Sequence, residues 1–354
     1  MKKKINWALA GTGGISNRFV IGLKSAEGAI PYAVVSRTKE NAAGFASRHS
    51  IKKTYDDFDK MLKDPSIDAV YIGTPNTTHH DLTIKALKAK KAVLCEKPAA
   101  INARELDEMI RAARDNKVFF MEALWNRFSP PLVKVREWLR DGLIGEIKMI
   151  EANFGSIAPY NPKSRIFDPG QGGGALLDIG IYPLSLFSMI YGGKKPERVV
   201  SQMYFNEAGT DSMTSVTLSY GSSWAGHFTV AFGFPMTNGA WIYGTAGRIH
   251  IPHFSFAHRA ELYAEPRYTY QYEPEYISNG YNYEAEEVMD RIREGRTESS
   301  IVPWEESLNL AETMDTIRAQ WNFKYPSEDK LPSEDKLPSE TKSPPKNKAA
   351  LKKL

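Results

Sequence analysis

One lysine follows an apolar run in the first third of the chain: Lys97, in the stretch Val93 to Pro98. Such a run predicts a buried strand, and an ammonium group where the strand ends can polarise a substrate hydroxyl or lower the pKa of a neighbouring acid. Most lysines at strand ends are simply solvated. Lys97 therefore becomes a candidate catalytic residue only through the residues that accompany it.

A second candidate group lies in the glycine-rich stretch from Gly172 to Pro183. Three consecutive glycines imply a backbone that passes very close to another group. Asp178 and Tyr182 are four residues apart, so on a helix they share one face. A tyrosine near a lysine can transfer a proton, because the ammonium stabilises the phenolate that is left behind. The alternative is that Tyr182 packs in the core and Asp178 caps a helix.

Short apolar runs in the first 124 residues alternate with helical stretches. The predicted strands cover residues 5–10, 30–36, 69–72, 92–95 and 118–121. The first predicted helix ends near residue 26, and the other three cover residues 39–49, 79–89 and 103–115. Strands that alternate with helices form βαβ units and a parallel sheet. Lys97 follows the fourth of these strands.

The segment between the first strand and the first helix is a relaxed dinucleotide fingerprint. Its first glycine permits a tight turn, its second lets the backbone approach a pyrophosphate, and its third position needs only a small residue, here Ser16. The helix N-terminus that follows presents free N–H groups to phosphates. This context predicts a cofactor site that includes Gly11, Thr12, Gly13, Gly14 and Ile15.

The end of the second predicted strand distinguishes between the two nicotinamide cofactors. NAD enzymes usually carry an Asp or Glu there, which binds the ribose 2′-hydroxyl. This chain has Ser36, Arg37 and Thr38, which offer a guanidinium and two hydroxyls to a 2′-phosphate. The sequence therefore predicts NADP(H) in preference to NAD(H). The alternative is that Arg37 is a solvated loop arginine.

The pattern changes after about residue 124. A helix is predicted over 129–141, followed by strands over 146–154, 198–205, 213–220, 223–232 and 241–251, a strand-like stretch over 268–272, and closing helices over 283–293 and 305–320. Turns between the strands favour an antiparallel sheet. From Pro326 a polar six-residue repeat predicts a disordered tail, because such a segment cannot bury enough apolar surface.

These motifs together resemble the Gfo/Idh/MocA oxidoreductase family over about residues 4 to 323. The residues that carry the resemblance are Gly11-x-Gly13, Thr74-Pro75-Asn76-x-x-His79, Glu96-Lys97-Pro98, and Gly172-Gly173-Gly174 with Asp178 and Tyr182. Many members have histidine at the position of Tyr182. Tyrosine there is similar to the dihydrodiol dehydrogenase, D-xylose dehydrogenase and glucose–fructose oxidoreductase branch. The stretch Met121 to Phe128 also resembles the dihydrodiol dehydrogenase subgroup.

The resemblance implies a fold of two domains and a tail. Residues 1–124 would form a Rossmann dinucleotide-binding domain, residues 125–325 an α+β domain built on an open, mainly antiparallel sheet, and residues 326–354 the disordered tail. The free face of the second sheet commonly forms an interface in the family, so a homodimer or tetramer is expected. The Lys97–Pro98 peptide bond is expected to be cis.

The resemblance also implies roles for individual residues. Lys97 would orient the substrate oxygen and contact the cofactor, Tyr182 would act as general acid or base, and Asp178 would bind substrate hydroxyls or Lys97. The nicotinamide side would be lined by Thr74, Pro75, Asn76 and His79, with Glu96 also at the cofactor. Trp125 and Arg127 would bind substrate, unless they pack or pair at the domain junction.

The implied activity is hydride transfer between NADP(H) and a sugar, a polyol or a trans-dihydrodiol. One alternative is a catalytically silent NADP-binding regulator, although intact Lys97, Asp178 and Tyr182 argue against it. The other is a sugar–sugar oxidoreductase that does not release its cofactor. A cofactor-clamping arm would favour that reading, and only four residues precede Ile5.

Composition excludes several other classes. The net charge of +4 leaves no basic stripe for nucleic acid, and no run of about 18 apolar residues predicts a membrane span. The single cysteine, Cys95, suits a reducing cytosol, so a cytoplasmic protein is expected. His250 and His253 would point to opposite faces of a strand, so no metal site is predicted.

Overall fold

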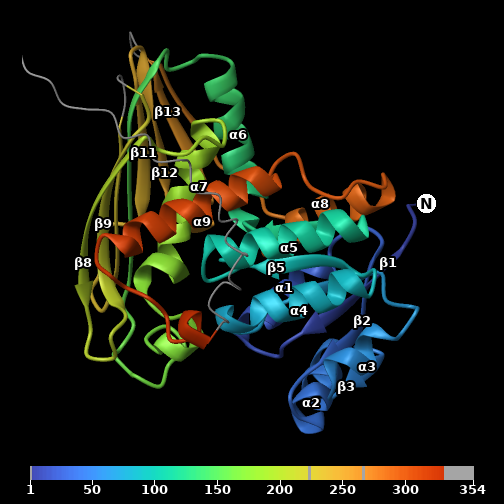
Figure 1. Cartoon of the computed structure of the whole chain (residues 1–354). Coiled ribbons are helices and arrows are strands. Elements are labelled where there is room, and N and C mark those ends of the chain that lie inside the picture. The colour runs from blue at the N-terminus through green and yellow to red at the C-terminus, as the bar shows by residue number, and fades with distance from the viewer. Residues whose placement is uncertain (1, 222–224, 265–267, 331–354) are drawn as a thin grey trace, which may run out of the picture.

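The computed structural model describes residues 2–221, 225–264 and 268–330, which form two β-sheets with helices packed around them (Figure 1). The first sheet is parallel and the second is mainly antiparallel. This arrangement confirms the predicted fold class.

The first sheet has six strands in the order β3-β2-β1-β4-β5-β6. Their bounds are β1 (Ile5–Ala10), β2 (Ala29–Val35), β3 (Lys53–Tyr55), β4 (Ala69–Ile72), β5 (Ala92–Glu96) and β6 (Phe120–Ala123). The strand order reverses between β1 and β4, and ligands bind outside the carboxyl ends of the strands at such a point. The glycine-rich turn after β1 lies there.

The helices of this domain are α1 (Gly14–Leu23), α2 (Lys39–His49), α3 (Phe58–Leu62), α4 (His79–Lys88) and α5 (Ala103–Asn116). The side chain of Asn102 accepts the backbone N–H of Glu105 at 2.9 Å and so caps the start of α5. The sequence did not predict β3 and α3. Both are short, and β3 is a polar edge strand with no apolar run to reveal it.

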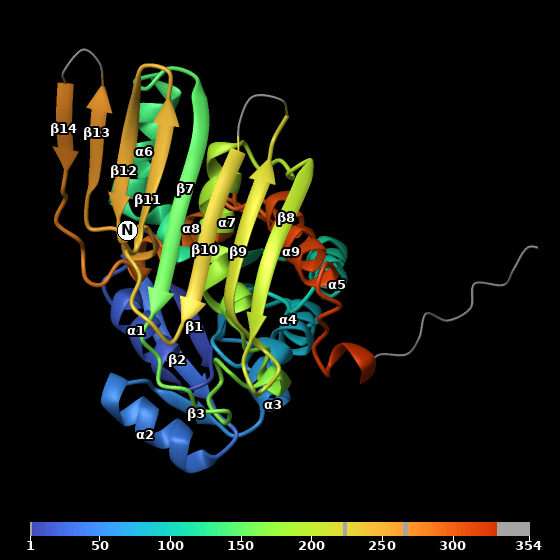
Figure 2. The same cartoon turned by 90° about the vertical axis from the view of Figure 1, so that its left-hand side faces the viewer.

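The second sheet has eight strands in the order β14-β13-β12-β11-β7-β10-β9-β8, and Figure 2 looks onto its outer face. The bounds are β7 (Ile147–Ser156), β8 (Arg198–Phe205), β9 (Asp211–Ser219), β10 (Ala225–Phe232), β11 (Gly239–Gly244), β12 (Gly247–Pro252), β13 (Ala260–Ala264) and β14 (Tyr268–Tyr272). Strands β7 and β10 pair in parallel and the other neighbours are antiparallel.

The prediction of one long strand over 241–251 is wrong, because this stretch is the hairpin of β11 and β12. Gly244 and Gly247 flank its turn. A side chain at Gly244 would collide with the backbone of Ile144, and one at Gly247 with the backbone of Tyr263. The glycines that allow this tight passage are the signal that the strand interpretation overlooked. Strand β13 was also not predicted.

Helices cover the inner face of the second sheet: α6 (Pro130–Arg140), α7 (Ile181–Ile190) and α9 (Trp304–Ala319) (Figure 2). Helix α9 also packs on α5, and α8 (Tyr281–Arg293) packs on α1. The closing helices therefore tie the end of the chain back to the first domain. The stretch Pro169–Ile190 is long and apolar enough to cross a membrane by composition, but most of it is buried within the protein, as in a core helix.

The prediction of disorder from Pro326 is wrong for the first residues of that segment. Tyr325 is buried, and Glu328, in the short turn η6 (Glu328–Lys330), accepts from the guanidinium of Arg318 at 2.7 Å. These contacts hold residues 326–330 against the body of the protein. The rest of the predicted tail lies outside the described residues.

Candidate active site

Lys97, Asp178 and Tyr182 converge on one point although they lie on separate elements. Lys97 follows β5, Asp178 lies in the π-helical turn η4 (Leu176–Gly180), and Tyr182 lies in the first turn of α7. The Lys97 Nζ donates to the backbone oxygen of Asp178 at 2.6 Å and lies 3.6 Å from its Oδ1. The same nitrogen lies 4.8 Å from the centroid of the Tyr182 ring. The Lys97–Pro98 peptide bond is cis.

The three glycines before η4 are needed because the backbone passes between packed groups. Gly172 and Gly174 have φ values of +73° and +118°, which side-chain-bearing residues rarely adopt. A side chain at Gly173 would meet the backbone oxygen of Arg165 at 2.8 Å. Asn76 Nδ2 donates to the Gly172 oxygen at 3.1 Å, so this loop contacts the first domain. The predicted close approach is therefore confirmed.

Asp211, which the sequence analysis did not identify, holds the start of η4. Its Oδ2 accepts from the backbone N–H of Leu176 and from the hydroxyl of Thr214, each at 2.7 Å. The carboxyl group is fully buried, and burial raises its pKa to about 6. Asp211 begins a strand of alternating pattern, and nothing in that pattern indicates its partner 35 residues earlier.

Arg165 is a second residue that the sequence analysis missed. Its Nη1 donates to Asp178 Oδ1 at 3.0 Å. Burial would raise the pKa of Asp178, but the positive charges of Lys97 and Arg165 lower it below its ordinary value. Asp178 is therefore an ionised carboxylate between two cations.

Tyr182 is a buried phenol with a polar partner. Trp125 Nε1 donates to its hydroxyl at 3.1 Å, and the Phe154 ring meets it edge-on at 5.7 Å. Burial raises the pKa of Tyr182 above its ordinary value, while the charge of Lys97 and the bond from Trp125 act in the opposite direction. Tyr182 is therefore protonated at neutral pH.

The charge state of Lys97 follows from the same environment. Burial would lower the pKa of Lys97, but the phenolate that Tyr182 becomes at high pH and the carboxylate of Asp178 outweigh burial, and the pKa of Lys97 is raised. Lys97 is thus an ammonium, held against Asp178 and over the face of the Tyr182 ring, within the range of a cation–π contact.

The structure separates the two weaker candidates, Trp125 and Arg127, which share the turn η2 (Trp125–Phe128). Trp125 reaches Tyr182, and its ring stacks on Tyr281 at 4.8 Å. Arg127 is buried and donates to both carboxylate oxygens of Glu306, at 2.8 and 3.2 Å. Arg127 therefore pairs at the domain junction, which was the alternative to substrate binding.

His79 and Glu96 support Lys97 from the first domain. The fully buried His79 ring places Nδ1 3.0 Å from the oxygen of Pro98 and Nε2 2.9 Å from the oxygen of Thr74. Burial lowers the pKa of His79 to about 4. Glu96 is buried and accepts from the Tyr71 hydroxyl at 2.6 Å. These residues fix the segment that carries Lys97 against the ends of β4 and β5.

The glycine-rich turn fits a dinucleotide. Gly11 has a φ of +102°, and a side chain there would meet the Gly73 oxygen at 2.7 Å. Gly13 precedes α1, and no described side chain caps that helix, so its first N–H groups are available to phosphates. The space beside Gly13 and Gly14 is open in the described structure.

The three residues predicted to bind a 2′-phosphate follow the end of β2. Arg37 is exposed and makes no hydrogen bond or ion pair with the residues that the structure describes. The Ser36 and Thr12 hydroxyl oxygens are 3.4 Å apart. Thr38 instead caps α2, accepting the N–H of Asn41 at 3.2 Å. Ser36 and Arg37 are therefore better placed than Thr38 to bind a 2′-phosphate.

Within the described residues, no group of three or more His, Cys, Asp or Glu side chains could hold a metal ion. His250 lies 3.0 Å from Glu261 Oε2 and stacks on Trp241 at 4.1 Å. His250 therefore contacts residues of the two neighbouring strands on one face of the second sheet.

Family models match two parts of the chain. Residues 5–124 match a model described as an oxidoreductase family with an NAD-binding Rossmann fold. Residues 132–250 match a GFO/IDH/MocA C-terminal domain. The first match ends just after β6, and the second begins in α6 and ends within β12, so each model lies within one of the two domains.

Curated relatives named trans-1,2-dihydrobenzene-1,2-diol dehydrogenase match nearly the whole chain. The Xenopus laevis protein is 36% identical over 329 residues, which are 90% of this chain and 99% of the relative. The Mus musculus protein is 34% identical over 337 residues, which are 92% of this chain and 99% of the relative.

Solved structures share the fold at lower sequence identity. A 3-ketoreductase from Actinomadura kijaniata in complex with NADP and TDP-benzene has a TM-score of 0.80 and is 22% identical, covering 90% of this chain and 98% of its own. An aldose–aldose oxidoreductase from Caulobacter crescentus, complexed with glycerol, has a TM-score of 0.80 at 23% identity and covers 90% and 97%. A levoglucosan dehydrogenase complexed with NADH has a TM-score of 0.82 at 20% identity and covers 90% and 96%.

Proposed function

The chain belongs to the Gfo/Idh/MocA family of oxidoreductases, and from this premise we propose that it transfers a hydride between NADP(H) and a diol carried on an apolar ring. It is a dehydrogenase or reductase that acts on CH–OH groups. The observation that carries the proposal is the convergence of Lys97, Asp178 and Tyr182. The intact group argues against a silent regulator.

A bound nicotinamide would supply or accept the hydride. Tyr182, protonated at neutral pH, would donate its proton to the substrate oxygen during reduction, and the Lys97 ammonium would stabilise the phenolate. Arg165 Nη1 donates to Asp178 Oδ1, and Lys97 Nζ lies 3.6 Å from the same oxygen. No donor among the described residues forms a hydrogen bond with Asp178 Oδ2. That second oxygen would accept a hydrogen bond from a substrate hydroxyl.

Aromatic side chains around Tyr182 support a ring-bearing diol over a polyhydroxylated sugar. Phe154 contacts Tyr182 edge-on, and Phe256 lies 5.3 Å from the Trp125 ring with 39% of its surface exposed. Exposed apolar groups beside a buried polar cluster favour a substrate with an apolar body and few hydroxyls. The names of the curated relatives agree with this class.

The NADP(H) preference rests on Ser36 and Arg37 and on the lack of a carboxylate beside them at the end of β2. The structures with similar folds contain either NADP or NADH, so this chain's own residues are the basis of the proposal.

An absorbance assay of the reduced nicotinamide tests the proposed function. The purified protein would be offered NADP⁺ and NAD⁺ with trans-1,2-dihydrobenzene-1,2-diol, and in parallel with pentoses and hexoses. We expect the highest kcat/KM with the dihydrodiol and NADP⁺. Higher kcat/KM with every sugar than with the diol would contradict the ring-bearing class. Turnover between two sugars without cofactor release would favour the sugar–sugar alternative.

A second copy of this chain would cover the outer face of the second sheet. In Figure 2 this face carries no helix among the described residues. It presents aromatic and apolar groups: the Trp241 ring stacked on His250, Arg248 over the Tyr263 ring at 5.0 Å, and Tyr204, which is 51% exposed. Light scattering should give twice the chain mass for the wild type and the single-chain mass for Trp241→Glu. A monomeric wild type would overturn this proposal.

A further inference from the structure

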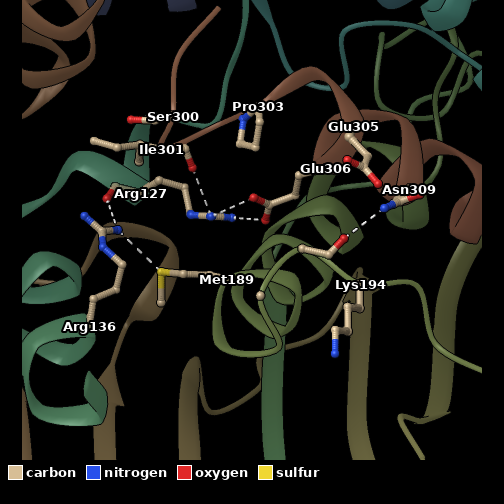
Figure 3. A pocket seen from close by; sticks show the side chains of 12 residues that line it. Arg127, Arg136, Met189, Lys194, Ser300, Ile301, Pro303, Glu305, Glu306 and Asn309 are labelled. Carbon is tan, nitrogen blue, oxygen red and sulfur yellow. Dashed lines mark hydrogen bonds and ion pairs between the residues drawn. The ribbon is translucent and has the colours of Figure 1, made fainter. Parts of the chain in front are cut away.

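A cavity of about 460 Å³ lies away from the catalytic group, between η2, α6, the end of α7 and the start of α9 (Figure 3). Arg127, Arg136, Met189 and Glu306 are among its lining residues, whereas Lys97, Asp178 and Tyr182 are not. Its volume falls in the range of small-molecule sites, about 300–1,000 Å³. This cavity and the proposed catalytic site therefore share none of these three residues.

The two arginines of this cavity differ in how their charges are balanced. Arg127 faces Glu306, which accepts from both of its terminal nitrogens. Arg136 Nη1 donates to the backbone oxygen of Arg127 at 2.6 Å and contacts the Met189 sulfur at 3.5 Å. No carboxylate among the described residues pairs with Arg136. Most of its guanidinium N–H groups therefore have no protein acceptor there.

The electrostatics agree with an uncompensated positive charge at this point. Burial and the adjacent charge of Arg127 lower the pKa of Arg136 to about 10. Helix α9 begins at the same cavity, but the Glu298 carboxylate accepts the N–H of its first residue, Trp304, at 2.9 Å, so the positive charge of the cavity comes from its side chains. Glu305 also lines the cavity but is exposed, and Glu306 is already neutralised by Arg127.

We propose that this cavity binds a small organic oxyanion, a carboxylate or a phosphate monoester, whose charged group pairs with Arg136. A planar guanidinium with unused donors binds both groups through paired N–H bonds. The cavity is larger than one inorganic ion requires, which leaves room for the organic part of the ligand. Figure 3 shows Arg136 and Arg127 side by side at one end of the cavity, while the Lys194 side chain points away from them.

Calorimetric titration of the wild-type protein, saturated with its nicotinamide cofactor, tests this site. The bound cofactor keeps added phosphate away from the glycine-rich turn at α1. Inorganic phosphate and acetate are titrated separately, with chloride added to hold the ionic strength constant. Saturable binding of phosphate alone assigns a phosphate monoester, and saturable binding of acetate alone assigns a carboxylate. Saturable binding of neither probe overturns the proposal.

Variants locate the binding. Arg136→Gln should weaken the affinity for the bound anion by about tenfold or more, a loss of about 1.4 kcal/mol. Arg140→Gln removes one positive charge from the same helix at an exposed position and should leave the binding unchanged. Equal binding by Arg136→Gln and wild type contradicts the site.

A readout on the wild type needs no variant and covers the case in which Arg136→Gln does not fold. Crystals of the cofactor-bound protein soaked in selenate should show an anomalous selenium peak beside the Arg136 guanidinium. Selenium peaks found only elsewhere, or none, contradict the proposal.

Discussion

The indole N–H of Trp125 donates to the phenol oxygen of Tyr182 at 3.1 Å, across 57 positions of sequence. This bond favours the phenolate form and so opposes the effect of burial, which raises the pKa of Tyr182. Trp125 also stacks on Tyr281, so its ring is held in place by a second contact. The proposed proton-transfer group, Tyr182, is therefore tuned by a residue that follows β6.

Replacing Trp125 by Phe should retain an aromatic ring and remove the donor. A hydrogen bond to a charged group is worth about 1.5–3 kcal/mol, so the pKa of Tyr182 should rise by about one unit or more. In the proposed mechanism oxidation needs ionised Tyr182, so kcat/KM for oxidation should increase with pH, and the rising limb of that profile should move to higher pH in Trp125→Phe. The matched control is Trp138→Phe, on α6. An unmoved limb in Trp125→Phe would show that the indole N–H does not influence the reacting group.

Arg127 and Glu306 form a buried ion pair that joins η2 to α9. Removing one partner leaves an uncompensated buried charge, which typically costs about 3–5 kcal/mol. Arg127→Met should therefore lower the free energy of unfolding strongly, and adding Glu306→Leu should recover a large part of the loss. Urea unfolding of the two single variants and the double variant measures the coupling. Strictly additive losses would contradict the pairing.

Asp211 makes the stability of the protein depend on pH. Its folded pKa of about 6 lies above the unfolded value of about 3.9, so folding favours the protonated form. The stabilisation from this protonation is complete below the unfolded pKa and is lost as pH rises through about 6. Asp211→Asn cannot titrate, so between about pH 4 and pH 8 it should gain stability relative to wild type, by up to about 3 kcal/mol. Parallel urea curves across that range would refute the shifted titration.

Arg37 should select the cofactor. Arg37→Gln removes the exposed guanidinium at the end of β2 and leaves α1 and its glycines intact. We expect KM for NADP⁺ to rise by about tenfold or more while KM for NAD⁺ changes little, because only NADP⁺ carries the 2′-phosphate. Arg48→Gln, an exposed arginine on α2, is the charge-matched control. Equal changes for both cofactors would mean that Arg37 does not contact the phosphate.

Local motifs predicted the parts of the site that lie next to one another in the chain. The turn at Gly11, the lysine after β5 and the shared helical face of Asp178 and Tyr182 each depend on short-range geometry, and the family resemblance joined them. Arg165 and Asp211 could not be found in this way, because their partners are brought to them by tertiary packing. Arg127 shows the converse, since its position near Trp125 suggested a substrate contact that the buried Glu306 replaces.

In the fold, too, the features set by short-range sequence patterns were predicted and those set by tertiary packing were not. Short apolar runs that alternate with helical stretches predicted the strands of the first sheet, except for β3, which is short and polar. The hairpin of β11 and β12 was read as one strand because both arms are apolar at alternate positions, and only the close backbone passage at Gly244 and Gly247 reveals the turn. Residues 326–330 are polar but packed, because Glu328 meets the cation of Arg318.

The central claim is that Lys97 and Tyr182 act together in proton transfer, and the most direct measurement is the turnover number of Lys97→Met. A positioned proton-transfer group contributes about 10²–10⁴-fold, so we predict a loss of kcat of that order, with a circular dichroism spectrum and melting temperature close to those of wild type. A folded Lys97→Met protein that retains near-wild-type kcat would contradict the account.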